Sequence, residues 1–135
     1  MFEKYMLLTR GFRNVSKNGQ VTGFQVGVRI TYYRGIYVSL IEGFDVNIDG
    51  EDFGPEKISF SIGNRSFPIT DIGTAIDIRW HFGDVATLTI EKPGGLPPGL
   101  HDILLTEKLR LSYHATNRKT RLSVARMRKK MTLVE

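Results

Sequence analysis

Histidine is the side chain whose protonation changes near neutral pH, and this 135-residue chain has three, at positions 81, 101 and 114. They form neither a His-x-His nor a His-Glu-x-x-His motif, so a metal site would require them to meet carboxylates in space. Asp77 and His81 would share one face of a strand, because both positions are odd. We interpret this pair as part of a polar outer face, with metal binding or proton transfer as the alternative.

Motifs for nucleophilic catalysis and phosphate binding are absent from the sequence. There is no cysteine, which excludes thiol catalysis, disulfides and Cys-ligated zinc, and no serine lies in a Gly-x-Ser-x-Gly motif. The Gly-rich segment from Pro93 to Gly99 lacks Gly-Lys-Ser/Thr and is predicted to be a connecting loop. Glu42 and Asp45 are three positions apart, which predicts opposite faces of a strand and ordinary surface charges. We therefore predict no catalytic residue, cofactor or metal ligand on this chain.

The densest group of side chains suited to binding lies between residues 30 and 37, where three tyrosines and an arginine surround a turn. Tyr and Arg are frequent at binding hot spots because they combine large contact area with hydrogen bonding. A second group is centred on Trp80, which is in phase with Ile76 and Ile78 toward the core, so that its two neighbours face outward. The residues predicted to contact a partner or substrate are Tyr32, Tyr33, Arg34, Tyr37, Arg79 and His81. Edge residues that cover a small sandwich are the alternative interpretation.

The strands that must position these residues are indicated by a hydrophobic period of two. The alternating segments are residues 23–30, 44–49, 58–62, 76–82, 86–90 and 108–113. Asn18-Gly19 is a type I′ hairpin signal, and Asp49-Gly50 and Gly63-Asn64 mark two further strand ends. About eight short strands separated by turns predict an all-β chain folded as an antiparallel sandwich or barrel, and of the two we expect a single-domain antiparallel β-sandwich.

Positive charge is concentrated at the C-terminal end, although the whole chain has a net charge of +5. Residues 1–115 carry 12 basic and 13 acidic side chains, whereas residues 116–130 carry seven basic and no acidic ones. We predict a β-sandwich domain over residues 1–115 and a basic C-terminal arm over residues 116–135, packed on or extending from the domain. The spacing of Val124, Met127, Met131 and Val134 also allows a short helix, and residues 131–134 could instead add an edge strand.

The basic segment contains no aromatic side chain on which bases could stack, and an acidic protein surface fits it equally well. We expect no nucleic-acid partner. No run approaches the roughly 18–20 apolar residues of a membrane span, and no apolar segment typical of a signal peptide follows Met1. We therefore expect a cytoplasmic protein without a membrane partner.

An ordered series of segments resembles the β subunit of bacterial C-glycoside deglycosidases, and the similarity runs from about residue 4 to the C-terminal residues 131–135. The segments are TRGFRNV (9–15), VTGFQ (21–25), VRITYYRGI (28–36), SLIEGF (39–44), RWHFG (79–83) and KPGGL (92–96). The resemblance implies a small β-sandwich subunit that pairs with a larger α subunit, a sugar-isomerase-like TIM barrel holding a divalent metal, usually manganese. The six contact residues would then lie at the subunit interface or at the rim of the substrate pocket.

The resemblance also implies the reaction of the complex. It would cleave the carbon–carbon bond between a sugar and an aromatic aglycone such as a flavonoid, after a separate enzyme has oxidised the sugar to a 3-keto C-glycoside. The ketone acidifies the C2 proton, so that the aglycone leaves by β-elimination, with the catalytic base on the α subunit. The alternative is a stand-alone carbohydrate- or protein-binding β-sandwich module. Nucleic-acid binding through the basic segment is a third hypothesis, which steep salt dependence would reveal.

Overall fold

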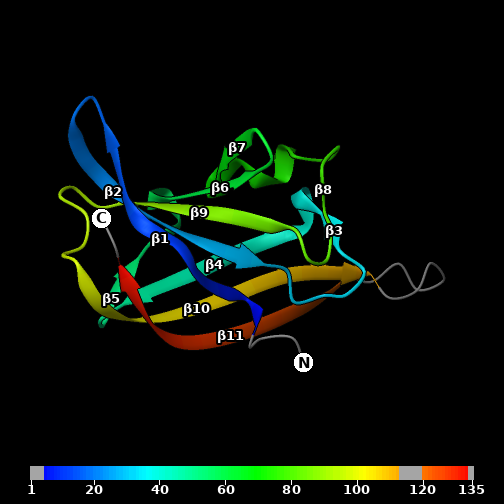
Figure 1. Cartoon of the computed structure of the whole chain (residues 1–135). Coiled ribbons are helices and arrows are strands. Elements are labelled where there is room, and N and C mark those ends of the chain that lie inside the picture. The colour runs from blue at the N-terminus through cyan, green and yellow to red at the C-terminus, as the bar shows by residue number, and fades with distance from the viewer. Residues whose placement is uncertain (1–4, 113–119, 134–135) are drawn as a thin grey trace.

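Two antiparallel sheets and a short ribbon make up the part of the chain that the computed structural model describes, residues 5–112 and 120–133 (Figure 1). The strands of the first sheet, in spatial order, are β1 (Leu7–Lys17), β2 (Gln20–Arg29), β9 (Val85–Glu91), β6 (Ile58–Ile62) and β7 (Arg65–Pro68). Those of the second are β11 (Thr120–Leu133), β10 (Gly99–Ser112), β4 (Ile41–Ile48) and β5 (Glu51–Phe53). The ribbon pairs β3 (Ile36–Tyr37) with β8 (Arg79–Trp80), and the connections include the 3-10 helices η2 (Val38–Leu40), η3 (Pro55–Lys57) and η4 (Ile69–Thr74). The predicted all-β, single-domain antiparallel fold is confirmed.

The hairpin turns form where the sequence predicts them. Asn18 and Gly19 have φ angles of 54° and 80° and join β1 to β2, while Asp49 and Gly50, at 52° and 90°, join β4 to β5. Two consecutive residues with positive φ are the requirement of a type I′ turn, whose twist matches that of the paired strands. These turns set the register of both hairpins.

Aromatic side chains from the two sheets meet in the core. Phe60 of β6 lies 5.1 Å from Trp80 and 6.1 Å from Phe44 of β4, measured between ring centroids. At the other end of the sandwich, Phe24 of β2 and Phe53 of β5 are in edge-to-face contact at 5.5 Å. Burial of each such ring contributes roughly 2–3 kcal/mol. The predicted core position of Trp80 is therefore confirmed, and its burial anchors the β3–β8 ribbon.

Within the segment predicted as a strand over residues 76–82, only Arg79 and Trp80 form a strand. The helix η4 precedes it and buries Ile69 and Ile72, after which the chain turns outward. Ile76 is consequently 72% exposed, and the expectation that it would pack beside Trp80 is wrong. The alternating pattern wrongly predicted a strand over residues 76–78. The core at this position is covered instead by Ile69 and Ile72 of the 3-10 helix η4.

The described part of the basic C-terminal segment is an edge strand of the second sheet. β11 pairs with β10 along its length, from Thr120 opposite Ser112 to Leu133 opposite Gly99. Odd-numbered residues such as Met131 face the core, and the charged side chains at the even positions 126, 128 and 130 are exposed. The helix alternative is therefore wrong over residues 120–133, and residues 116–119 and 134–135 lie outside the described residues. Within the described residues, no helix is long and apolar enough to cross a membrane.

Candidate functional site

The β3–β8 ribbon places two of the predicted contact residues side by side. Tyr37 stands opposite Arg79 in the register, and the Arg79 guanidinium carbon lies 4.9 Å from the centre of the Tyr37 ring. Arg79 Nη2 also donates a hydrogen bond to the carbonyl oxygen of Arg34 at 3.0 Å. The neighbouring pair of the register, Ile36 and Trp80, is buried in the core. Their packing holds the backbone from which Tyr37 and Arg79 point outward. A cation over an aromatic ring is held in place yet still accessible to a partner.

Gly35 makes this close approach of the two segments possible. Its φ angle is +68°, and a Cβ at this position would lie 2.6 Å from the carbonyl oxygen of Trp80. No L side chain avoids that contact without a shift of the backbone. The glycine therefore brings the turn that carries Tyr33 and Arg34 against β8.

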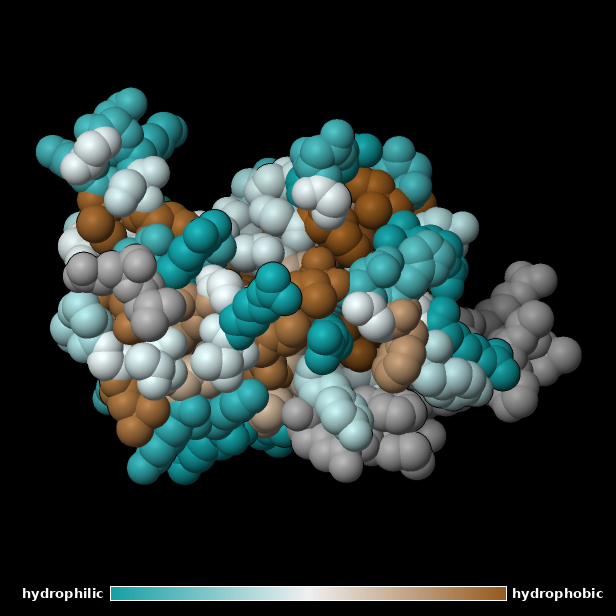
Figure 2. All heavy atoms as spheres, viewed as in Figure 1, coloured by the Kyte–Doolittle hydropathy of each residue, from teal (hydrophilic) through white to brown (hydrophobic). Residues whose placement is uncertain are grey.

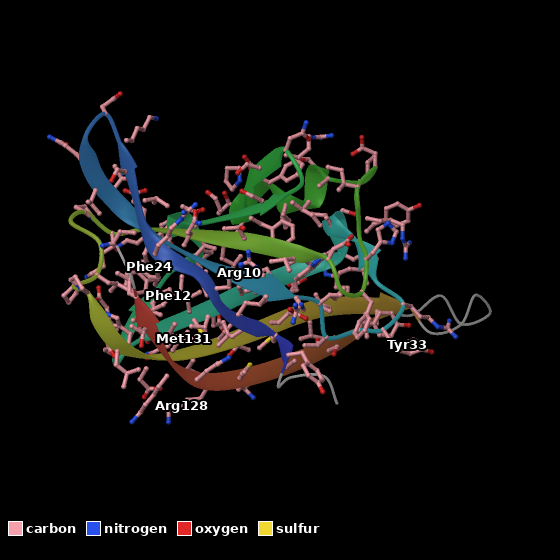
Figure 3. The ribbon with its side chains drawn as sticks, viewed as in Figure 1. Arg10, Phe12, Phe24, Tyr33, Arg128 and Met131 are labelled. Atoms are coloured by element: carbon pink, nitrogen blue, oxygen red, sulfur yellow. The ribbon has the colours of Figure 1, made fainter. Side chains whose placement is uncertain are left out.

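The turn itself is ordered by contacts among its own side chains. Tyr32 and Tyr33 are in edge-to-face contact at 5.5 Å, and Arg34 Nε donates a hydrogen bond to the Tyr33 hydroxyl at 3.0 Å. That hydrogen bond raises the pKa of Arg34, which keeps its positive charge. Tyr33 is 58% exposed and lies at the opposite end of the molecule from Phe12 and Phe24 (Figure 3).

A hollow of about 210 Å³ lies between the turn, the ribbon and β10. Its lining is Tyr32, Arg34, Gly35, Ile36, Tyr37, Leu40, Arg79, Arg110 and Leu111. Pockets for drug-sized ligands span roughly 300–1,000 Å³, so this hollow is suited to one or two side chains of a partner rather than to a whole substrate. The structure thus brings together Tyr32, Arg34, Tyr37 and Arg79, with Tyr33 on the neighbouring surface. His81 is exposed and does not line the hollow.

Arg110 belongs to this site although it is not among the six contact residues predicted from the sequence. It lies on β10, is exposed, and its Nε donates to Glu42 of β4. Glu42 and Asp45 are both exposed, so their predicted placement on opposite faces is wrong. A register shift of β10 against β4, between Lys108 and Leu109, inserts the extra residue that brings both carboxylates to one face.

A buried carboxyl group supports the turn from inside the sandwich. Glu107 of β10 is fully buried, and its Oε1 accepts hydrogen bonds from the backbone N–H of Thr31 at 3.0 Å and from its hydroxyl at 2.7 Å. Its Oε2 is also buried and has no hydrogen-bond partner among the described residues. Burial raises the pKa of Glu107 to about 7, although the hydrogen bonds from Thr31 lower it. Glu107 is not among the residues predicted from the sequence, although its position in phase with Leu105 and Leu109 indicates an inward-facing carboxyl group.

His101 forms a separate polar contact that joins two loops. It is almost fully buried, with Nδ1 2.5 Å from Asp49 Oδ2 and Nε2 2.7 Å from the carbonyl oxygen of Pro97. Since both ring nitrogens face acceptors, the geometry requires both to donate, which describes an imidazolium. Burial acts to lower the pKa of His101, but the hydrogen bonds with Asp49 and Pro97 outweigh it and the pKa is raised. The same hydrogen bond lowers the pKa of Asp49.

The other histidines do not join this contact. His81 is exposed, as is Asp77, and His114 lies outside the described residues. Within residues 5–112 and 120–133, no three His, Asp or Glu side chains come together in a group that could hold a metal ion. The contacts that the candidate site itself shows are hydrogen bonds, cation–π contacts and aromatic packing.

Comparison with known proteins identifies the family of the chain. The family model described as C-glycoside deglycosidase beta subunit matches residues 2–113, a range that ends before β11. A C-glycoside deglycosidase beta subunit of Eubacterium cellulosolvens is 32% identical over 102 residues, which cover 75% of this chain and 69% of the relative. The 3'-dehydrocarminate deglycosidase beta subunit of a Microbacterium species is 27% identical over 93 residues, covering 68% of this chain and 69% of that protein. The chain therefore belongs to the C-glycoside deglycosidase beta subunit family.

Proposed function

We propose that this chain is the non-catalytic beta subunit of a C-glycoside deglycosidase and works in complex with a larger alpha subunit in the cytoplasm. The observation that carries the proposal is the family match over residues 2–113. The names of both relatives support it, because each describes a beta subunit of a deglycosidase. The name of the second relative also specifies a dehydro compound, as expected if a sugar hydroxyl is oxidised to a ketone before cleavage.

In this proposal the alpha subunit, a TIM barrel with a divalent metal such as manganese, carries out the bond cleavage. The sugar of a 3-keto C-glycoside, for example a flavonoid glucoside, has an acidic C2 proton because the adjacent ketone stabilises the carbanion. A base removes that proton, the C1–C2 double bond forms, and the bond from C1 to the aglycone breaks. The aglycone leaves with the electron pair and takes up a proton. In this proposal all of these steps belong to the alpha subunit.

The role that we assign to this chain is to dock on the alpha subunit and to complete the rim of its substrate pocket. The hollow beside Tyr37 and Arg79 has the volume of partner side chains, and its outward groups are cationic and aromatic. Such groups dominate the energy of protein interfaces. A stand-alone carbohydrate-binding module is the second candidate, because the exposed rings of Tyr33 and Tyr37 could also stack on a sugar.

Coexpression of this chain with an alpha subunit tests the proposal. We expect one complex on size-exclusion chromatography, cleavage of a 3-keto C-glycoside by the complex, and no cleavage by this chain alone. Full activity of this chain alone would refute its non-catalytic role, and the absence of a complex would refute the partnership. Calorimetry of the isolated chain with the same sugar tests the module hypothesis, which requires measurable affinity without the alpha subunit.

A further inference from the structure

A second hollowed surface lies on the outer face of the first sheet and extends to Phe82 and Gly83, just after β8. Gln25, Gly27 and Arg29 of β2 share this face, since alternate residues of a strand point the same way. Two hollows of about 390 and 410 Å³ adjoin here, and Arg29 lines both. We call this surface the Arg10–Arg29 groove. Its polar lining consists of Arg10, Gln25, Arg29 and Thr87, and its aromatic lining of Tyr5 and Phe82.

Local backbone features of β1 and β2 create this groove. The pairing of β1 with β2 shifts between Leu8 and Arg13, and Gly11 within that stretch has a φ angle of +86°. On β2, a Cβ at Gly27 would lie 3.4 Å from Val85 Cγ1 and 3.5 Å from Leu8 Cβ. Any longer side chain at position 27 would therefore fill the floor of the groove. The hollow depends on two glycines and an irregular strand rather than on a flat sheet.

The charges of the groove are not balanced by the described residues. No described Asp or Glu lines it, and neither Arg10 nor Arg29 forms an ion pair with a described residue. The cations on the outer face of the second sheet differ, because Lys108 pairs with Asp45 at 2.9 Å and Arg110 pairs with Glu42. Two guanidinium groups in one hollow without a carboxylate are electrostatically complementary to an anionic partner.

The composition of the groove favours a polypeptide over a small molecule. Its lining contains Arg, Tyr and Phe but no Lys, Asp or Glu, which is the composition of the centre of protein interfaces. Each hollow has the volume of a small-molecule site, but such a site encloses most of its ligand, whereas Tyr5, Phe82 and Val85 at this groove are all about half exposed. Arg10 lies beside β1 near the middle of the view in Figure 3, and hydrophilic and hydrophobic side chains alternate over that region in Figure 2.

We propose that the Arg10–Arg29 groove docks an extended acidic segment of the alpha subunit. Carboxylates of that segment would pair with Arg10 and Arg29, and its apolar side chains would lie against the aromatic rings of Tyr5 and Phe82. The proposal rests on the proposed function, because it takes the alpha subunit as the partner. It adds a second contact surface, of defined charge, to the one at Tyr37 and Arg79.

The affinity of the alpha subunit for variants of this chain tests the proposal. We expect the double variant R10A/R29A to bind at least about tenfold more weakly and with a shallower dependence on salt, because two charge-assisted contacts are lost. The matched control R126A/R128A removes the same charge from the outer face of β11 and should bind as the wild type does. Gly27→Leu fills the groove without a change of charge and should weaken binding while the salt dependence is kept. Thermal unfolding of each variant verifies that it is folded.

The outcomes separate this proposal from the proposed function. If R10A/R29A and Gly27→Leu both bind the alpha subunit as tightly as the wild type does, the groove is not a docking site. The partnership of the subunits would still stand. Equal weakening by R126A/R128A would show an effect of overall charge and would likewise overturn it. If the wild-type chain does not bind the alpha subunit at all, both proposals fail.

Discussion

Thr31 donates both its backbone N–H and its hydroxyl to a single oxygen of Glu107, and the other carboxyl oxygen is buried without a partner among the described residues. Thr31 directly precedes the turn that carries Tyr32 and Tyr33. The carboxyl group of β10 therefore fixes the point at which the chain leaves β2 and enters the candidate site.

Replacement of Glu107 by Gln should change how stability depends on pH. Because the pKa of Glu107 is raised from 4.5 to about 7 in the folded chain, its contribution is fully present below about pH 4.5 and is lost as pH rises through 7. The loss amounts to about 3 kcal/mol. We expect Glu107→Gln to be more stable than the wild type at pH 8 and similar to it at pH 4, as measured by urea unfolding. Glu91→Gln, at an exposed position of β9, is the control, and parallel pH profiles for wild type and Glu107→Gln would contradict the prediction.

Replacement of Gly35 by Ala should destabilise the chain by at least about 2 kcal/mol. The φ angle of +68° is unfavourable for alanine, and its Cβ would also meet the carbonyl oxygen of Trp80. Gly63→Ala is a matched control, because Gly63 has a φ angle of +58° but a Cβ added there would meet no atom within 4 Å. The control should lose only about 1 kcal/mol, and equal losses in urea unfolding would argue against the steric contribution.

Replacement of Tyr37 or Arg79 by Ala should weaken binding of the alpha subunit by at least about tenfold each. Both side chains are exposed, so the free energy of unfolding should change by less than about 1 kcal/mol. The double variant should lose less than the sum of the two single losses, because the two side chains stack on one another. Leu100→Ala, at an exposed apolar position at the start of β10, is the control. Unchanged affinity of both single variants would exclude this surface from the interface.

Replacement of His101 by Gln should destabilise the chain most between about pH 4 and 6.5. The raised pKa of His101 means that its contribution is fully present below about 6.5 and is lost as pH rises through the folded value. The lowered pKa of Asp49 means that its contribution is present above 3.8 and is lost as pH falls through the folded value. We expect a loss of roughly 1–3 kcal/mol in that window by urea unfolding. A double-mutant cycle with Asp49→Asn isolates the pair, and additive effects would contradict a direct interaction.

The period-two pattern predicted much of the fold because it reflects burial of one face of each strand, a local property of the sequence. It also predicted that Arg79 would face outward, whereas Tyr37 was selected for the density of tyrosines at the turn. The stacking of one on the other depends on the pairing of β3 with β8 across 42 residues of sequence. The face on which Glu42 lies could not be predicted, because a register shift against a distant strand changes the alternation. The presence of Glu107 in the core was visible in the pattern, whereas its contact with Thr31 was not.

The C-terminal strand has a consequence for the chain before it meets a partner. β11 is 14 residues long and lies at the edge of its sheet, and an edge of that length is a template on which further copies can assemble into aggregates. The exposed side chains of Arg126 and Lys130 give this edge positive charge, while Arg128 pairs with Asp102 of the adjacent β10 at 3.6 Å. A second copy that approached this edge would bring the same positive charges against them, and the repulsion between like charges opposes self-association.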